Sequence, residues 1–127
     1  MNHARSSFTV DDRDASPVIW EGGAMSRTRF AKKFTGDLVG SSVVEATMLM
    51  LENAGPVAYV GLERIEGTLH GRTGTFVLLH SATGSQGDNH GSWTIVPGSG
   101  GGGLAGIRGS GEITDQHDFV LEYEVDA

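Results

Sequence analysis

Apolar and polar residues alternate with a period of two along most of the chain. Side chains of a β-strand point alternately to the two faces of a sheet, so this period is typical of strands. The segment 45–52 also has helical propensity. Its apolar residues are continuous rather than spaced by three and four, which favours a strand. We predict strands over residues 6–10, 28–35, 42–52, 57–69, 75–83, 90–96, 109–114 and 118–125.

Glycine-rich and polar segments separate these strands. The phrase Gly-x-Leu-x-Gly-x-x-Gly occurs at 67–74 and at 102–109, and a shortened copy stands at 36–40. Glycine permits the bends and bulges that close a sheet on itself. About eight strands joined by short turns therefore predict an all-β chain, a single antiparallel β-barrel of the calycin-like kind. The turns and loops are expected at 11–17, 36–42, 53–56, 84–89 and 97–103.

Length and charge narrow the class of protein. A chain of 127 residues suits one domain, 1–127, with residues 1–5 as a flexible N-terminus. It lacks cysteine, a run of about 20 apolar residues and an apolar segment typical of a secretory signal. We therefore expect a cytoplasmic protein with no membrane partner. Nine basic against sixteen acidic residues give 9 − 16 = −7, which argues against a nucleic-acid partner. The basic stretch 27–33 is predicted to be a solvated face.

Several segments together resemble a known bacterial family. They are KFTGDL at 33–38, YVGLERIEGTLHGRTGTFVLLH at 59–80, WTIVPGSG at 93–100, GLAGIRG at 103–109 and FVLEY at 119–123. The chain resembles, from about residue 7 onward, a family of small proteins of unknown function whose fold is a β-barrel akin to allene oxide cyclase and dirigent proteins. The resemblance implies an allene-oxide-cyclase-like barrel. Its more distant relatives use the barrel interior to control cyclisation of a reactive small molecule, but it implies no activity for this chain.

The strand faces select candidates for catalysis. We expect Glu63, His80, Glu45 and Tyr59 to point into the barrel. A carboxylate in an apolar cavity has a raised pKa and can act as an acid or base near neutral pH. Histidine can carry a proton, and a tyrosine hydroxyl can donate to a developing oxyanion. Glu63 and His80 lie on strands joined by a tight turn, so we expect them to be neighbours.

The expected ligand is a small hydrophobic molecule in a cavity of a few hundred Å³. The residues expected to bind it are Trp93, Phe30, Phe34, Tyr123 and Met48. The proposed reaction is a cofactor-independent cyclisation or isomerisation. Two alternatives stay open: a non-catalytic carrier with the same cavity, and a structural, homo-oligomeric module whose barrel is filled by side chains. In the structural alternative, Glu63 pairs with Arg64 or another arginine at the rim.

Other motifs give little support for cofactors. The glycines of 98–103 match the dinucleotide pattern as text, but no helix follows, as that site requires. This segment is instead expected to be a loop that could cover the barrel mouth. The histidines are scattered, and the local group Asp115, His117 and Asp118 is weak support for a metal site. We predict no metal and no cofactor.

Overall fold

The structure, a computed structural model, describes residues 1–53, 55–85, 88–114, 116 and 118–125. Every regular element in these ranges is a β-strand, as the alternation predicts, and residues 45–51 are strand rather than helix. None of the described residues belongs to a helix that could span a membrane. The strands are β1 Asn2–Trp20, β2 Gly23–Gly36, β3 Leu38–Leu51, β4 Gly55–Leu69, β5 Arg72–Ser85, β6 Asp88–Ile95, β7 Gly101–Gly102, β8 Arg108–Ile113 and β9 Asp118–Glu124.

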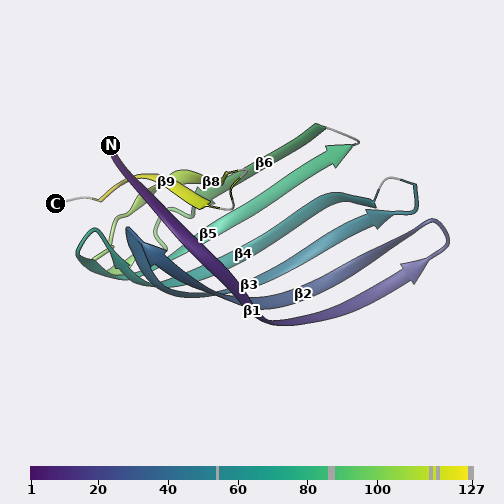
Figure 1. The fold of residues 1–127 in the computed structure, drawn as a ribbon, viewed down its shortest axis with the longest axis horizontal. Helices are drawn as coiled ribbons and strands as arrows, with labels where there is room; N and C mark the ends of the chain where they lie inside the picture. The colour runs from purple at the N-terminus through teal and green to yellow at the C-terminus, as the bar shows by residue number, and fades with distance from the viewer. Residues whose placement is uncertain (54, 86–87, 115, 117, 126–127) are drawn as a thin grey trace.

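One antiparallel sheet of nine strands closes into a ring. The strand order is β4-β3-β2-β1-β9-β8-β6-β5-β7, and β4 also pairs with β5. Closure is confined to one end of the long strands. There β9 pairs with Asn2–Ser7 of β1, and β8 pairs with β6 only at Trp93 and Thr94. Figure 1 shows β8, β9 and the start of β1 gathered at the left, whereas the hairpins of β1–β6 extend to the right. We call the end at which β8 and β9 complete the ring the closed half. We call the end with the β1–β2, β3–β4 and β5–β6 hairpins the open half.

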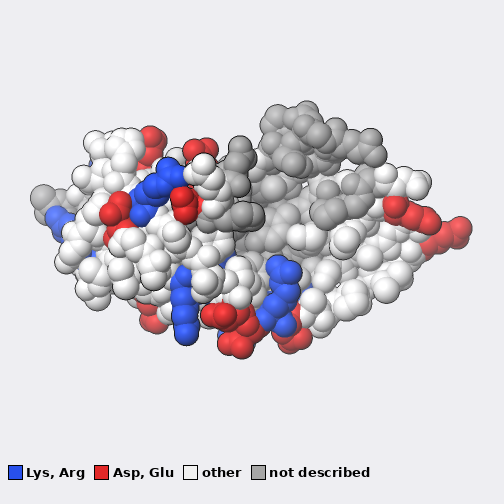
Figure 2. Space-filling model, viewed as in Figure 1, with Lys and Arg blue, Asp and Glu red and all other residues white. Residues whose placement is uncertain are grey.

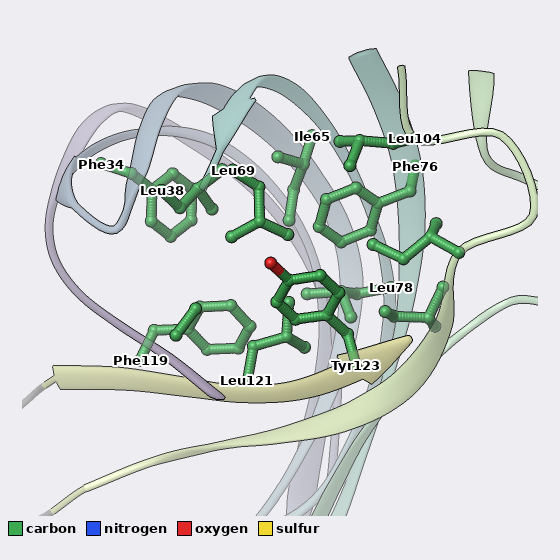
Figure 3. Packing of buried hydrophobic residues seen from close by; sticks show 13 residues of the cluster. Phe34, Leu38, Ile65, Leu69, Phe76, Leu78, Leu104, Phe119, Leu121 and Tyr123 are labelled. Carbon is green, nitrogen blue, oxygen red and sulfur yellow. The ribbon is translucent and has the colours of Figure 1, made fainter. Parts of the chain in front are cut away.

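The closed half is filled by apolar side chains. Figure 3 shows Phe34, Phe76, Phe119 and several leucines converging inside the ring from strands on all sides. The leucine of each glycine phrase belongs to this core, because Leu38, Leu69 and Leu104 are at most 1 % exposed. The repeated phrase therefore supplies core residues as well as turns. Burial of this cluster removes apolar surface from water and stabilises the closure.

Glycines allow close approach of the strands that surround this core. Gly40 lies opposite Gly67, and Gly67 lies opposite Gly74. A Cβ on Gly40 would be 2.1 Å from the carbonyl oxygen of Glu66, and one on Gly74 would be 2.1 Å from that of Gly101. The β4–β5 turn uses a different property. His70 and Gly71 both have positive φ, as a two-residue type I′ hairpin turn requires.

Several predicted boundaries are wrong; β2, for example, begins at Gly23 rather than at residue 28. The polar segment 11–17 is not a turn, because β1 runs through it with only a bulge between Asp11 and Asp14. It is polar because residues 9–20 are exposed along the open half. Residues 1–5 are mostly strand rather than a flexible N-terminus. The connection predicted at 36–42 shrinks to Asp37, since β3 begins at Leu38. Of the turn predicted at 84–89, residues 84–85 belong to β5 and 88–89 to β6, and residues 86–87 lie outside the described residues.

The segment predicted as a covering loop is anchored to the sheet. Gly101–Gly102 pairs with Gly74 and Thr75 of β5. The backbone N–H of Gly103 donates to the carbonyl of Thr73 at 2.7 Å, and Ser99 Oγ donates to the carbonyl of Val96 at 2.7 Å. These bonds hold the glycines of 98–103 against the closed half.

Candidate functional site

Four polar side chains are buried where the closed half meets the open half. Lys32, Ser42, Glu63 and His80 come from the adjacent strands β2, β3, β4 and β5, and each is at most 5 % exposed. Their positions follow from the register: Lys32 is opposite Ser42, Val44 is opposite Glu63, and His80 is opposite Gly61, which precedes Glu63 by two residues on β4. Alternation then directs all four to the inner face of the sheet.

The Glu63 carboxylate is the centre of this cluster. Its Oε1 atom lies 2.7 Å from His80 Nε2 and accepts a hydrogen bond from Lys32 Nζ at 3.3 Å. Its Oε2 atom accepts a short hydrogen bond from Ser42 Oγ. An ionised carboxylate only accepts hydrogen bonds, so His80 Nε2 carries a hydrogen here. Among the described residues, no hydrogen bond reaches the other ring nitrogen of His80, Nδ1.

These contacts keep Glu63 ionised, contrary to the expected raised pKa. Burial acts to raise the pKa of Glu63 and is the largest single influence. The hydrogen bond from His80, the charge of Lys32 and the hydrogen bond from Ser42 together outweigh it, and the pKa lies below its ordinary value. Glu63 therefore stays negatively charged and orients His80, and it does not act as a proton donor.

Aromatic rings surround the His80 imidazole. The ring centre of Tyr59 lies 6.1 Å away, and that of Trp93 lies 5.8 Å away in an edge-on arrangement. Burial, with help from the charge of Glu63, raises the pKa of Tyr59 to about 12, so its hydroxyl keeps its proton. The indole Nε1 atom of Trp93 is buried, and no hydrogen-bond partner among the described residues reaches it. The ammonium group of Lys32 has an aromatic neighbour of its own, because its Nζ atom lies 4.6 Å from the centre of the Phe8 ring.

The structure brings together only some of the predicted site residues. Glu63, His80, Tyr59 and Trp93 are close, as expected. The prediction that Glu45 points into the barrel is wrong. Its side chain is 76 % exposed on the outer face, 3.7 Å from Arg29. The strand 42–52 buries Ser42, Val44 and Ala46 instead, so the side with Glu45 faces solvent. The structural alternative for Glu63 also named the wrong partner, because Arg64 pairs with Glu66.

The predicted ligand-binding residues divide between the two halves. Phe34 and Tyr123 belong to the packed core of the closed half. Tyr123 is also hydrogen-bonded to His70. Phe30 lies in a second buried cluster, with Val44, Ala46 and the partly buried Tyr59. Met48 is opposite Tyr59 on the inner face of the open half.

Lys32 and Ser42 were missed by the sequence analysis. The basic stretch 27–33 is not one solvated face, because Lys32 is buried. The signal was present: Lys32 stands two residues from both Phe30 and Phe34, on the same face of a strand. Ser42 shares a face with Val44 in the same way.

Two open grooves lie on the outer face of the sheet. One, of about 570 Å³, is lined by outer-face residues including Met25, Leu49 and Val60, and it reaches Tyr59 and Ala82. The other, of about 640 Å³, lies beside Arg29, Glu45, Leu62 and Leu79. Neither groove includes Glu63 or His80, so the cavity predicted around them is not among these spaces. Within the described ranges, no cluster of His, Asp or Glu could hold a metal ion; Asp115 and His117 lie outside these ranges.

Comparisons with known proteins identify relatives without an assigned activity. A family model described as "Protein of unknown function (DUF3224)" matches residues 4–126. The chain is also similar to the crystal structure of a protein with unknown function from this family from Shewanella oneidensis MR-1. The two are 27 % identical, the match covers 100 % of this chain and 98 % of that one, and the TM-score is 0.84. No protein with a curated description matches the chain. These comparisons give no link to allene oxide cyclase or dirigent proteins.

Replacing Glu63 with glutamine is expected to destabilise the protein by about 3 kcal/mol at neutral pH, because Lys32 would remain buried without its partner. Denaturant unfolding measures this change. Glu66→Gln, in the exposed pair with Arg64, is the control and should cost less than about 1 kcal/mol. Equal stability of the two variants would contradict the buried pair.

The same residue should govern acid unfolding. The pKa of Glu63 is lower in the folded protein than its ordinary 4.5, so its stabilisation is present above that pH. It is lost as the pH falls through the folded value. Unfolding curves measured between neutral pH and pH 3 should therefore show a steeper loss of stability for the wild type than for Glu63→Gln. Parallel pH profiles would contradict this assignment.

The chain has two tyrosines, so their titration can be separated. In a Tyr123→Phe variant, tyrosinate absorbance should report Tyr59 with a midpoint near 12. Because the folded pKa is raised, stability is present below pH 10 and falls as the pH rises toward 12. Circular dichroism at each pH verifies that the chain is folded. A midpoint of 10 in folded protein would show that Tyr59 is solvated.

Proposed function

Because the chain belongs to the family described as Protein of unknown function (DUF3224), whose description assigns no activity, we propose a function from the site alone. The protein binds a small, largely apolar molecule on the inner face of the open half. His80 then moves a proton on that molecule, which makes the protein a cofactor-independent isomerase or cyclase. The observation that carries this proposal is the buried 2.7 Å contact between Glu63 and His80.

The inner face of the open half supports the binding step. Next to the buried cluster, Met48, Tyr59, Ala82 and Trp93 are only partly buried, so this part of the face is within reach of a ligand. The surface there is apolar and aromatic, with polar groups gathered at one end, as in ligand sites generally.

The Glu63–His80 pair supports proton transfer. Glu63 holds Nε2–H and fixes the imidazole, which leaves the lone pair of Nδ1 as the base. In the proposed reaction Nδ1 takes a proton from a ligand carbon that is next to a double bond. The C–H electron pair forms a new double bond to the adjacent carbon, and the displaced π pair takes the proton back from Nδ1 at the far carbon. The double bond has moved, and no other reactant is consumed.

The surface charge favours a small molecule over a nucleic acid. Figure 2 shows Lys and Arg side chains mixed with Asp and Glu over the left and lower parts of this face, and only Asp and Glu at its right end. The net charge of −7 adds a general repulsion of phosphate. The proposal also takes the ring as a β-barrel of the allene-oxide-cyclase type, on the resemblance described above.

The alternatives predict different properties. A carrier would bind the ligand without proton transfer. A structural module would bind nothing, and the packed closed half favours it. The outer face has exposed apolar side chains, among them Val60, Leu62 and Leu79. We therefore still predict self-association.

Binding can be tested with N-phenyl-1-naphthylamine, an uncharged apolar fluorophore. Met48 and Leu49 are adjacent on β3 and point to opposite faces. Met48→Arg places a charge on the inner face and should abolish the fluorescence increase. Leu49→Arg enters the outer groove and should leave it unchanged. The reverse result would place the ligand in the outer groove, and no increase with the wild type would favour the structural module.

Proton transfer can be tested with 4-tert-butylcyclohexanone, an apolar carbon acid, in D₂O. Proton NMR follows replacement of the hydrogens next to its carbonyl. The wild type should accelerate this exchange, and His80→Gln should lose at least about 100-fold of the acceleration, the usual share of a general base. Retained binding of N-phenyl-1-naphthylamine by His80→Gln is the control. Binding without accelerated exchange would favour the carrier.

A further inference from the structure

We infer that the ligand carries an uncharged carbonyl oxygen, and that this oxygen accepts a hydrogen bond from Nε1–H of Trp93. This inference rests on the proposed function and deepens it. It names the polar group of the ligand and gives Trp93 a role beyond that of an apolar wall.

The first observation is the unsatisfied donor itself. Trp93 Nε1 is buried, and no hydrogen-bond acceptor among the described residues reaches it. A buried polar group without a partner is costly, and native proteins rarely leave one unless a ligand or water completes it. Indole nitrogen only donates, so the missing group must be an acceptor.

The indole is also fixed in place beside the proposed base. Trp93 lies directly opposite His80 in the β5–β6 register, with the two ring centres 5.8 Å apart. The six-membered ring of Trp93 packs over Gly91, where a Cβ would be only 2.9 Å from it. A ligand atom bound to Nε1 would therefore be held close to His80.

The other polar groups around His80 also favour an acceptor. Both oxygens of Glu63 already accept hydrogen bonds. Lys32 has three donor hydrogens, and among the described residues its one hydrogen bond is to Glu63. The Tyr59 hydroxyl keeps its proton and can donate. Donors are thus in excess over free acceptors.

The buried charges determine whether the ligand oxygen is charged or neutral. The positive charge of Lys32 is already paired with Glu63 inside the sheet. A ligand carboxylate would bring a second negative charge close to Glu63 with no buried cation left to offset it, which is unfavourable at low dielectric. A neutral carbonyl meets the donor without this cost. It also makes the neighbouring C–H acidic, and Nε1–H can stabilise the negative charge that develops on oxygen when His80 removes the proton.

The experiment uses the indole N–H signals of ¹⁵N-labelled full-length protein. The chain has two tryptophans, and Trp20 is 44 % exposed, so its signal is an internal reference. The protein is titrated separately with 4-tert-butylcyclohexanone, with tert-butylcyclohexane and with 4-tert-butylcyclohexanecarboxylate. We expect the ketone to move the Trp93 proton downfield, and we expect the hydrocarbon to bind without such a shift. The carboxylate should bind at least about tenfold more weakly than the ketone.

A Trp93→Phe variant keeps an aromatic ring and removes the donor. It should lose about five- to tenfold in affinity for the ketone, the share of one hydrogen bond, with less than about twofold change for the hydrocarbon. Equal losses for both probes, or no downfield shift with the ketone, would overturn the inference. A stronger response to the carboxylate would overturn the choice of an uncharged oxygen. Binding of N-phenyl-1-naphthylamine is measured on the same samples, so failure of the whole site is distinguished from failure of this contact.

Discussion

One ionised carboxylate organises the interior of this protein. Glu63 lies where the packed core ends, and it accepts hydrogen bonds from side chains of three other strands. A charge in this position is tolerated only because Lys32, Ser42 and His80 together replace the water that it loses. The inner faces of β2, β3, β4 and β5 must therefore stay in register around it. The same requirement fixes the orientation of the imidazole on which the proposed chemistry depends.

The two halves of the sheet divide structural and chemical tasks. The closed half contains the large aromatic and aliphatic side chains, and glycines such as Gly40 and Gly74 let its strands approach closely. The open half has the same strands without the covering β8 and β9. At their boundary the core supplies a rigid support, while the neighbouring inner face is only partly covered. The polar residues at this boundary are desolvated and lie next to side chains that are only partly buried, and acid–base sites commonly have this setting.

Much of the fold could be predicted from the sequence, because the alternation of apolar and polar residues and the glycines between strands are local signals. They place the strands β3, β4 and β5 to within a few residues. The residues of the candidate site could be predicted from the sequence only in part. Glu63 and His80 were recognised from strands with a clear apolar face, whereas Glu45 was assigned to the wrong face because both sides of its strand are rich in apolar residues. Lys32 was overlooked because it stands among exposed basic residues, and only its hydrogen bond to Glu63 across the sheet explains its burial. The lowered pKa of Glu63 depends on those same long-range contacts.

A ring that closes at only one end leaves free strand edges at the other. Beyond Ser7, β1 pairs on one side only, with β2, and such an edge can template the addition of a strand from another molecule. The polar run that looked like a turn lies on this edge. The negative charges of Asp11, Asp12 and Asp14, the bulge among them and Pro17 all disfavour pairing with another backbone. The sequence of this segment thus allows the sheet to remain open while it disfavours edge-to-edge pairing with a strand of another molecule.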